Sequence, residues 1–64
     1  MEDLINRMIA FRGKHNLSQE KLAELCKLST QTIWAVESGQ QKPSKLTLAK
    51  IEEVLNNGFE HKQD

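Results

Sequence analysis

Two short helical patterns, separated by very few residues, constrain this chain more than any other feature. They cover residues 19–25 and 30–38, and each follows a serine, Ser18 or Ser29. A serine hydroxyl at such a position accepts a hydrogen bond from a backbone N–H group that has no partner inside the helix. Only residues 26–28 lie between the first pattern and Ser29. The second helix must therefore leave the first at a steep angle, and the two form one unit.

The apolar residues of this stretch support a crossing of two short helices. The small Ala23 stands where two helices can approach each other closely. A simple helical hairpin would need longer apolar stripes than this stretch contains. The expected geometry is therefore that of a helix-turn-helix. The residues expected to point toward a common interior are Leu22, Cys26, Leu28, Ile33 and Val36.

The length of 64 residues allows one domain with a small core, because a chain of this size buries only about 60% of the surface of its unfolded state. Further helices are expected over residues 3–15 and from Ser44 to residue 56. We expect an all-α fold, a compact bundle of four or five short helices over residues 1–58, followed by a short polar tail, residues 59–64. The buried stripes of the flanking helices are expected to contain Leu4, Met8, Phe11, Leu48, Ile51 and Leu55.

Two expectations concern the last part of the chain. Glu52 and Glu53 are neighbours on a helix and therefore do not face each other, so we interpret them as a solvated edge and not as an acid/base pair. Phe59 is expected to fold back as a hydrophobic clasp.

Composition argues against several classes of function. The single cysteine, Cys26, cannot form an internal disulfide and is interpreted as a small buried hydrophobe. The chain shows no signal peptide and no apolar run of membrane-spanning length, so a cytoplasmic location is expected. It also lacks a phosphate-binding glycine loop, a zinc-type Cys/His spacing and a nucleophile beside a base. We expect no catalysis, no metal, no cofactor and no small-molecule substrate.

The net charge is zero, but the charges are unevenly distributed. Between residues 12 and 51 there are seven basic side chains and three acidic ones, a local charge of +4. The two ends carry the compensating −4. This distribution is compatible with a modest positive patch near the two central helices.

A resemblance to a known family rests on residue types at fixed offsets from about residue 8 to residue 55. They are Leu17, Ser18, Gln19, Glu20, Leu22 and Ala23, then Leu28, Ser29, Thr32 and Ile33, then Glu37 and Gly39, then Lys42, Pro43 and Ser44. In these residues the chain resembles the lambda-repressor/Cro-type helix-turn-helix family, often called XRE-like. Small phage switch proteins, such as Cro-like and modulator-of-repression proteins, are similar. The resemblance implies a lambda-repressor-like fold and a transcriptional regulator.

The resemblance also implies binding of operator DNA by the second helix of the motif, residues 30–38, in the major groove. Steps of 100° place Ile33, Val36 and Ser29 inward, with Glu37 beside them. Gln31 suits a bidentate contact to adenine, Thr30 a base or a phosphate, and the Ala35 methyl a thymine. By resemblance, Gln19 binds a phosphate, and Lys42 and Lys45 hold the DNA backbone. The predicted DNA-binding set is Gln19, Thr30, Gln31, Trp34, Ala35, Ser38, Lys42 and Lys45.

A second interpretation assigns the same surface to a protein partner. Residues 30–38 include no lysine or arginine, whereas related proteins often have basic residues there. They include Trp34 instead, a residue type enriched in protein interface hot spots. Packing at the core edge, contact with DNA and contact with protein all remain open for this side chain. In the second interpretation the chain is an antirepressor that binds and inactivates a partner repressor protein through Gln31, Trp34, Ala35 and Ser38.

Three further expectations follow from the resemblance. Arg12 and Glu37 match a pair that bridges two helices inside the domain, so we expect a partly buried ion pair with a structural role. Asn16 and Lys27 occupy turn positions where the family has glycine, and a left-handed backbone is expected at both. Because little chain beyond Leu55 is available for a C-terminal contact, a monomer or weak homodimer is expected.

Overall fold

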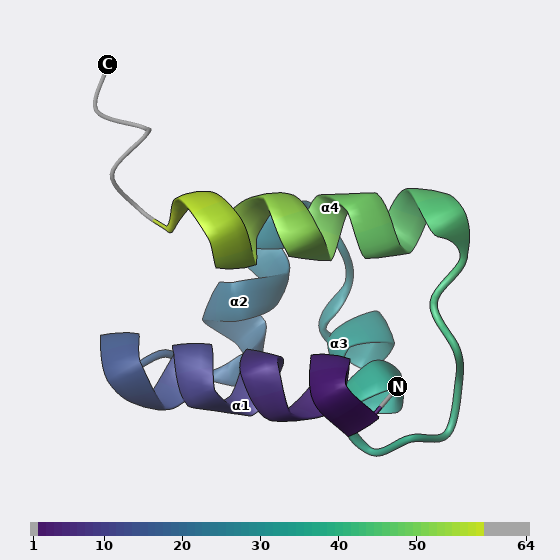
Figure 1. Ribbon diagram of the computed structural model, residues 1–64, viewed down its shortest axis with the longest axis horizontal. Coiled ribbons are helices and arrows are strands. Elements are labelled where there is room, and N and C mark those ends of the chain that lie inside the picture. The colour runs from purple at the N-terminus through teal and green to yellow at the C-terminus, as the bar shows by residue number, and fades with distance from the viewer. Residues whose placement is uncertain (1, 59–64) are drawn as a thin grey trace.

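The computed structural model describes residues 2–58, with the side chain of Glu2 excepted, and this part of the chain is all-α. Its four helices are α1 (Glu2–His15), α2 (Gln19–Cys26), α3 (Thr30–Glu37) and α4 (Lys45–Asn57). Figure 1 shows α2 between α1 and α4, with α3 beside them and joined to α4 by a loop at the edge of the molecule. The expected all-α fold with a helix-turn-helix, α2 and α3, is confirmed.

Three serines fix where the later helices begin. Each has an extended backbone, and its hydroxyl accepts a hydrogen bond from the N–H group three residues on. The N···O distances are 3.0 Å for Ser18, 3.1 Å for Ser29 and 3.2 Å for Ser44. Because such caps depend on local sequence alone, the starts of α2, α3 and α4 follow the prediction closely.

The turns at the ends of α1 and α2 both contain one residue with a left-handed backbone. Asn16 and Lys27 both adopt a left-handed conformation, with φ of 57° and 60°. In each turn the following N–H group reaches back to a helix carbonyl, from Leu17 to Arg12 at 2.8 Å and from Leu28 to Ala23 at 2.9 Å. A side chain at such a position costs about 1 kcal/mol or more, so the turn at Lys27 carries some strain.

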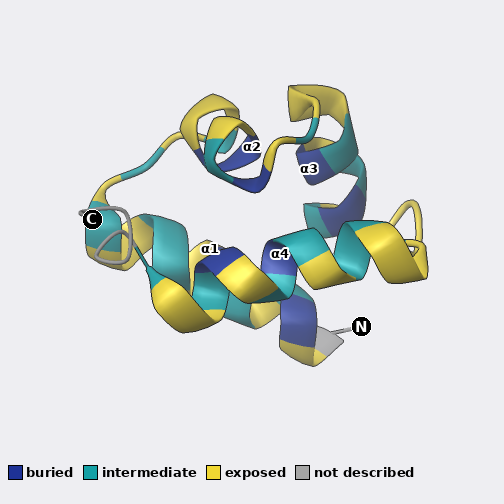
Figure 2. Cartoon of the chain, turned by 90° about the horizontal axis from the view of Figure 1, so that it is seen from above, coloured by how far each residue is buried: buried dark blue, intermediate teal, exposed yellow. Residues whose placement is uncertain are grey.

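The core lies where all four helices meet (Figure 2). Its buried side chains are Leu4, Met8, Leu22, Ala23, Cys26, Ile33, Val36, Ile51 and Val54. Phe11, Leu25, Leu28, Leu48 and Leu55 pack against it from partly exposed positions. Loss of a buried leucine-sized side chain from so small a core would cost about 2–5 kcal/mol, a large part of the stability of a small domain.

Three details of the sequence interpretation need correction or lie outside the described part. Ser29 was expected inward but is exposed, because its hydroxyl serves the start of α3 and bonds the Thr32 hydroxyl at 2.8 Å. The expected stripe of α4 missed Val54, which is buried because α4 packs against α2 as well as α1. The predicted clasp by Phe59 and the predicted polar tail fall outside the described residues.

The interpretation of Glu52 as a solvated edge was wrong. Its carboxylate accepts two hydrogen bonds from the Arg7 guanidinium, at 2.8 and 3.0 Å, and so connects α4 to α1. Glu53 is exposed, as expected. Among residues 2–58, no helix has the length and apolar character needed to cross a membrane.

Candidate nucleic-acid interface

The two sides of α3 differ completely in burial. Ile33 and Val36 are buried in the core, whereas Gln31 and Ser38 are exposed. Trp34 retains 49% of its surface in contact with solvent, although it is the largest side chain of the helix. It is not among the partly buried hydrophobic side chains that pack against the core. We call the outward side chains of this helix, Thr30, Gln31, Trp34, Ala35 and Ser38, the α3 face.

The hydrogen-bonding groups at the start of the α3 face have no partner among residues 2–58. Within the described part of the chain, the side chains of Thr30 and Gln31 make no hydrogen bond. Ser38 differs, because its hydroxyl donates to the Ala35 carbonyl at 3.2 Å. Ala35 itself is half-buried. The amide of Gln31 is therefore the principal unused polar group of the α3 face.

The inward end of α3 is held by a network that links three helices. Arg12 donates from Nε and Nη2 to the two carboxylate oxygens of Glu37, each at 2.9 Å. Arg12 Nη1 also donates to the Leu17 carbonyl at 3.2 Å, and Gln19 Nε2 donates to Glu37 Oε1 at 3.0 Å. The Glu37 side chain is only 5% exposed, and that of Arg12 is 24% exposed. The structure therefore contains the Arg12–Glu37 ion pair expected from the sequence.

This network also determines the charge of the α3 face. Glu37 is the only charged residue between positions 30 and 38, and its carboxylate is turned inward against Arg12. The hydrogen bond to Glu37 raises the pKa of Arg12 further above its ordinary value, so the guanidinium stays charged near neutral pH. The outward side of α3 consequently presents neither an acid that would repel phosphate nor a base that would attract it.

Gln19, the predicted phosphate ligand, has a structural role in the free protein. It is the first residue of α2, yet its side chain reaches Glu37 at the last residue of α3. A glutamine amide has two N–H donors, and the bond to Glu37 uses one of them. The start of α2 thus lies beside the end of α3, where one amide N–H of Gln19 remains available.

The predicted basic contacts lie beyond the carboxyl end of α3. Lys42 and Lys45 are exposed, in the loop before α4 and at the first residue of α4. Lys42 borders a shallow hollow of about 250 Å³ together with Thr32 and Ser44. This hollow lies between α3 and the start of α4. Lys42 and Lys45 therefore follow α3 in the chain and are not part of it.

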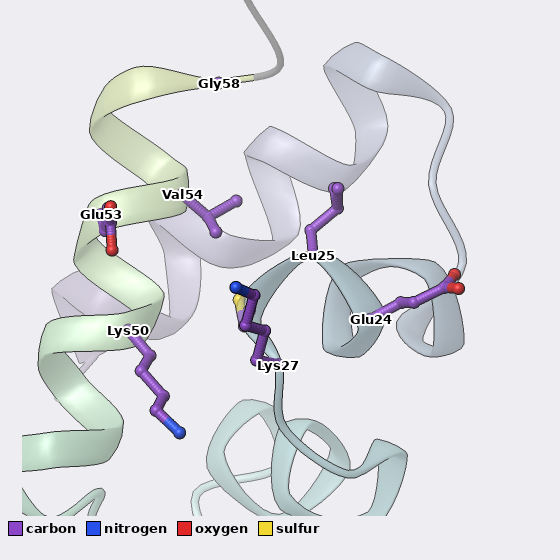
Figure 3. A pocket seen from close by; sticks show the side chains of 8 residues that line it. Glu24, Leu25, Lys27, Lys50, Glu53, Val54 and Gly58 are labelled. Carbon is purple, nitrogen blue, oxygen red and sulfur yellow. The ribbon is translucent and has the colours of Figure 1, made fainter. Parts of the chain in front are cut away.

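Lys27, in the turn between α2 and α3, lines a different cavity. Its ammonium group points into the space between α2 and α4 (Figure 3). The cavity there measures about 480 Å³ and is lined by Glu24, Leu25, Cys26, Lys27, Lys50, Glu53, Val54 and Gly58. Burial raises the pKa of the Cys26 thiol to about 11, so this cysteine remains a thiol and behaves as a core residue. In the described part of the chain, no group of three His, Cys, Asp or Glu side chains is arranged to hold a metal ion.

Comparison with known proteins is consistent with this geometry. The chain matches the Helix-turn-helix family over residues 8–61. It belongs to the XRE-like helix-turn-helix family. An uncharacterized HTH-type transcriptional regulator of Methanocaldococcus jannaschii is 44% identical to it over 46 residues, which is 72% of this chain and 70% of that protein. No solved structure matches the chain.

Proposed function

We propose that this helix-turn-helix regulator binds operator DNA by laying α3 in the major groove. The observation that carries the proposal is the α3 face, on which Thr30 and Gln31 are exposed with unused hydrogen-bonding groups and which has no acidic residue. Ile33, Val36 and Glu37 hold this helix against the rest of the domain. A helix presented in this way fits the width of the major groove.

Each side chain has a defined role in this proposal. Gln31 makes a bidentate contact to adenine, Thr30 contacts a base or a phosphate, and Trp34 and Ala35 contact apolar parts of the groove. Residues around the helix position it on the duplex. Gln19 donates its remaining N–H to a phosphate, and Lys42 and Lys45 neutralise phosphates beyond the end of α3.

The proposed contacts imply weak electrostatic anchoring. Each neutralised phosphate contributes about 0.9 to the slope of log affinity against log salt concentration. With Lys42 and Lys45 as the main cations, the slope is expected to be only about 2. Nonspecific binding to duplex DNA should accordingly be weak.

The experiment is a titration of duplexes from the operator region of the protein's own locus at low salt. Gln31→Ala combined with Lys42→Ala should abolish specific binding, because the pair removes a base contact and a phosphate contact. Asn56→Ala, an exposed amide near the far end of α4, serves as the matched control and should bind like wild type. Equal binding by the double variant and wild type would reject the assignment of α3 as the DNA-reading helix.

A second candidate function is supported by Trp34 alone. A tryptophan that is 49% exposed on a helix without cations suits a protein interface, where truncation of such an anchor costs about 2 kcal/mol or more. In this function the α3 face, mainly Gln31, Trp34 and Ser38, covers the DNA-reading surface of a partner repressor. Trp34→Ala should then abolish binding to the repressor encoded beside it.

The two functions are separated by one pair of titrations, against operator DNA and against the neighbouring repressor. If wild type binds the operator tightly and Trp34→Ala does so equally well, the tryptophan is not needed for DNA, and no repressor complex is required to explain regulation. If wild type ignores DNA at low salt but forms a complex with the repressor, the antirepressor function holds. The mass measured by light scattering in the same samples tests the proposed state, a monomer or weak homodimer.

A further inference from the structure

We propose that the α3 face recognises A·T base pairs and does not read guanine, so that its operator is defined by adenine amide contacts and thymine methyl groups. This inference rests on the proposed DNA-binding function and specifies the class of DNA sequence that α3 accepts.

The first step concerns the contact to guanine. Guanine presents two acceptors, N7 and O6, in the major groove, and its usual partner is an arginine or lysine that donates two hydrogen bonds. The structure describes all of residues 30–38, and this segment includes no arginine or lysine. The α3 face therefore lacks the side-chain type that most often selects a G·C pair.

The nearby lysines do not supply the missing contact. The ammonium group of Lys27 points toward α4 (Figure 3), into a cavity that no residue of the α3 face lines. Lys42 and Lys45 lie past the carboxyl end of α3, Lys42 beside the hollow there and Lys45 at the first residue of α4. These positions suit the sugar–phosphate backbone that borders the groove and not the base edges at its centre.

The second step concerns Gln31, whose amide is exposed and makes no hydrogen bond within residues 2–58. A glutamine amide offers a donor and an acceptor side by side. Adenine presents the complementary pair, N7 as acceptor and the N6 amino group as donor. Guanine would satisfy the amide nitrogen of Gln31 but would leave its carbonyl oxygen facing the acceptor O6.

The third step concerns the apolar part of the α3 face. The C5-methyl of thymine is the apolar group that the base edges offer in the major groove. Trp34 is 49% exposed, and half-buried Ala35 precedes the next turn, so a methyl group can lose contact with water against them. Burial of one methyl-sized group corresponds to a gain in affinity of about three- to fourfold. The hydroxyls of Thr30 and Ser38 do not decide between bases, since a hydroxyl suits either kind of pair.

The experiment begins with selection of duplexes from a library of 20-base-pair DNA with a randomised centre, using the wild-type protein at low salt. A·T pairs should be enriched at the central positions. In the selected duplex, replacement of the contacted adenine by 7-deazaadenine removes N7 and should weaken binding by about tenfold. Replacement of each contacted thymine by uracil removes only the methyl and should weaken binding by about three- to fourfold.

Variants connect each effect to its side chain. Gln31→Ala should lose sensitivity to 7-deazaadenine and keep sensitivity to uracil. Trp34→Ala should show the opposite pattern, and Trp34→Phe should retain sensitivity to uracil. Gln31 is exposed, so Gln31→Ala should melt like wild type. Trp34 is only 49% exposed, so binding by its variants is measured well below their own melting temperatures. Asn56→Ala should retain both sensitivities.

Different outcomes distinguish failure of this inference from failure of the proposed function. Enrichment of G·C pairs at the central positions, or uracil and 7-deazaadenine duplexes that bind as tightly as the parent, would overturn the A·T inference while leaving DNA binding intact. Failure to enrich any duplex sequence at low salt would overturn the proposed function together with the inference.

Discussion

Among the residues that the structure describes, two ion pairs connect α1 to later helices, and they differ in burial far more than in geometry. Arg12 donates two hydrogen bonds of 2.9 Å to Glu37 of α3. Arg7 donates two hydrogen bonds, of 2.8 and 3.0 Å, to Glu52 of α4. In the first pair the guanidinium and carboxylate side chains are 24% and 5% exposed, and in the second they are 39% and 34% exposed. Both pairs are only partly buried; by comparison with each other, we call Arg12–Glu37 the buried pair and Arg7–Glu52 the exposed pair. Glu37 also accepts from Gln19.

The difference shows that bond length is a poor guide to what such a pair contributes. Removal of one partner from a buried pair leaves a charge without water or a counter-ion, whereas an exposed partner is solvated at once. The buried pair also lies directly behind the α3 face and fixes α3 against α1 and α2. The exposed pair connects α4 to α1.

The largest effect is expected from Glu37→Ala. It leaves the partly buried Arg12 guanidinium unpaired and removes the acceptor of Gln19, so the loss should approach the roughly 3–5 kcal/mol typical of a broken buried pair. A domain of 64 residues has a total stability of only about 3–10 kcal/mol. Urea unfolding monitored by circular dichroism should therefore show a large fall in the unfolding midpoint.

The matched control for Glu37→Ala is Glu53→Ala, which removes an exposed carboxylate from α4 and should change stability by no more than about 0.5 kcal/mol. If both variants unfold at the same urea concentration as wild type, the buried pair contributes no more than a surface charge.

A smaller effect is expected from Gln19→Ala. It removes one hydrogen bond to Glu37 but leaves the ion pair with Arg12 intact, so the loss should be about 1–2 kcal/mol. The same urea titration measures it, with Gln40→Ala, an exposed amide of the loop after α3, as the control. A loss as large as that of Glu37→Ala would mean that Gln19, and not Arg12, is the main partner of the carboxylate.

The existence of the Arg12–Glu37 pair could be anticipated from sequence, but that of the Arg7–Glu52 pair could not. Arg12 and Glu37 match a pair that bridges two helices in the XRE-like family, and this match predicted the contact. Arg7 and Glu52 are separated by 45 positions, and nothing local indicates which acidic residue of α4 faces α1. The available signal was that Arg7 and Glu52 directly flank the core positions Met8 and Ile51.

Local features followed the sequence more faithfully than long-range ones. The caps at Ser18, Ser29 and Ser44 and the left-handed turns at Asn16 and Lys27 depend on a few neighbouring residues, and all were predictable. Val54 was missed because its burial depends on how α4 packs on α2. The contact of Gln19 was missed for the same reason. Its partner, Glu37, is 18 positions away in the sequence and is brought close only by the packing of α2 and α3.

The exposed pair should respond to salt, whereas the buried pair should not. Glu52→Gln is expected to lower the melting temperature by much less than Glu37→Gln, because solvent screens the interaction of the Glu52 carboxylate with Arg7. Added sodium chloride should shrink the effect of Glu52→Gln and leave that of Glu37→Gln nearly unchanged, since buried pairs are screened much less. Melting curves of wild type and both variants at low and high salt measure the contrast. Parallel salt dependence of the two variants would show that the pairs have similar surroundings.

The smallest expected effect is the acid dependence of the Arg7–Glu52 pair. The hydrogen bond from Arg7 holds the pKa of the Glu52 carboxyl below its usual range. A carboxyl whose pKa is lowered on folding adds stability above its unfolded pKa, about 4.3, and that contribution disappears as the pH falls through the lower, folded value. The difference in melting temperature between wild type and Glu52→Gln should therefore be constant from pH 7 to about 5 and vanish at strongly acidic pH. Asn56→Ala, which leaves both charges of the pair in place, should show no such convergence with wild type. A difference that persists unchanged in acid would mean that Glu52 stabilises α4 through packing and not through its charge.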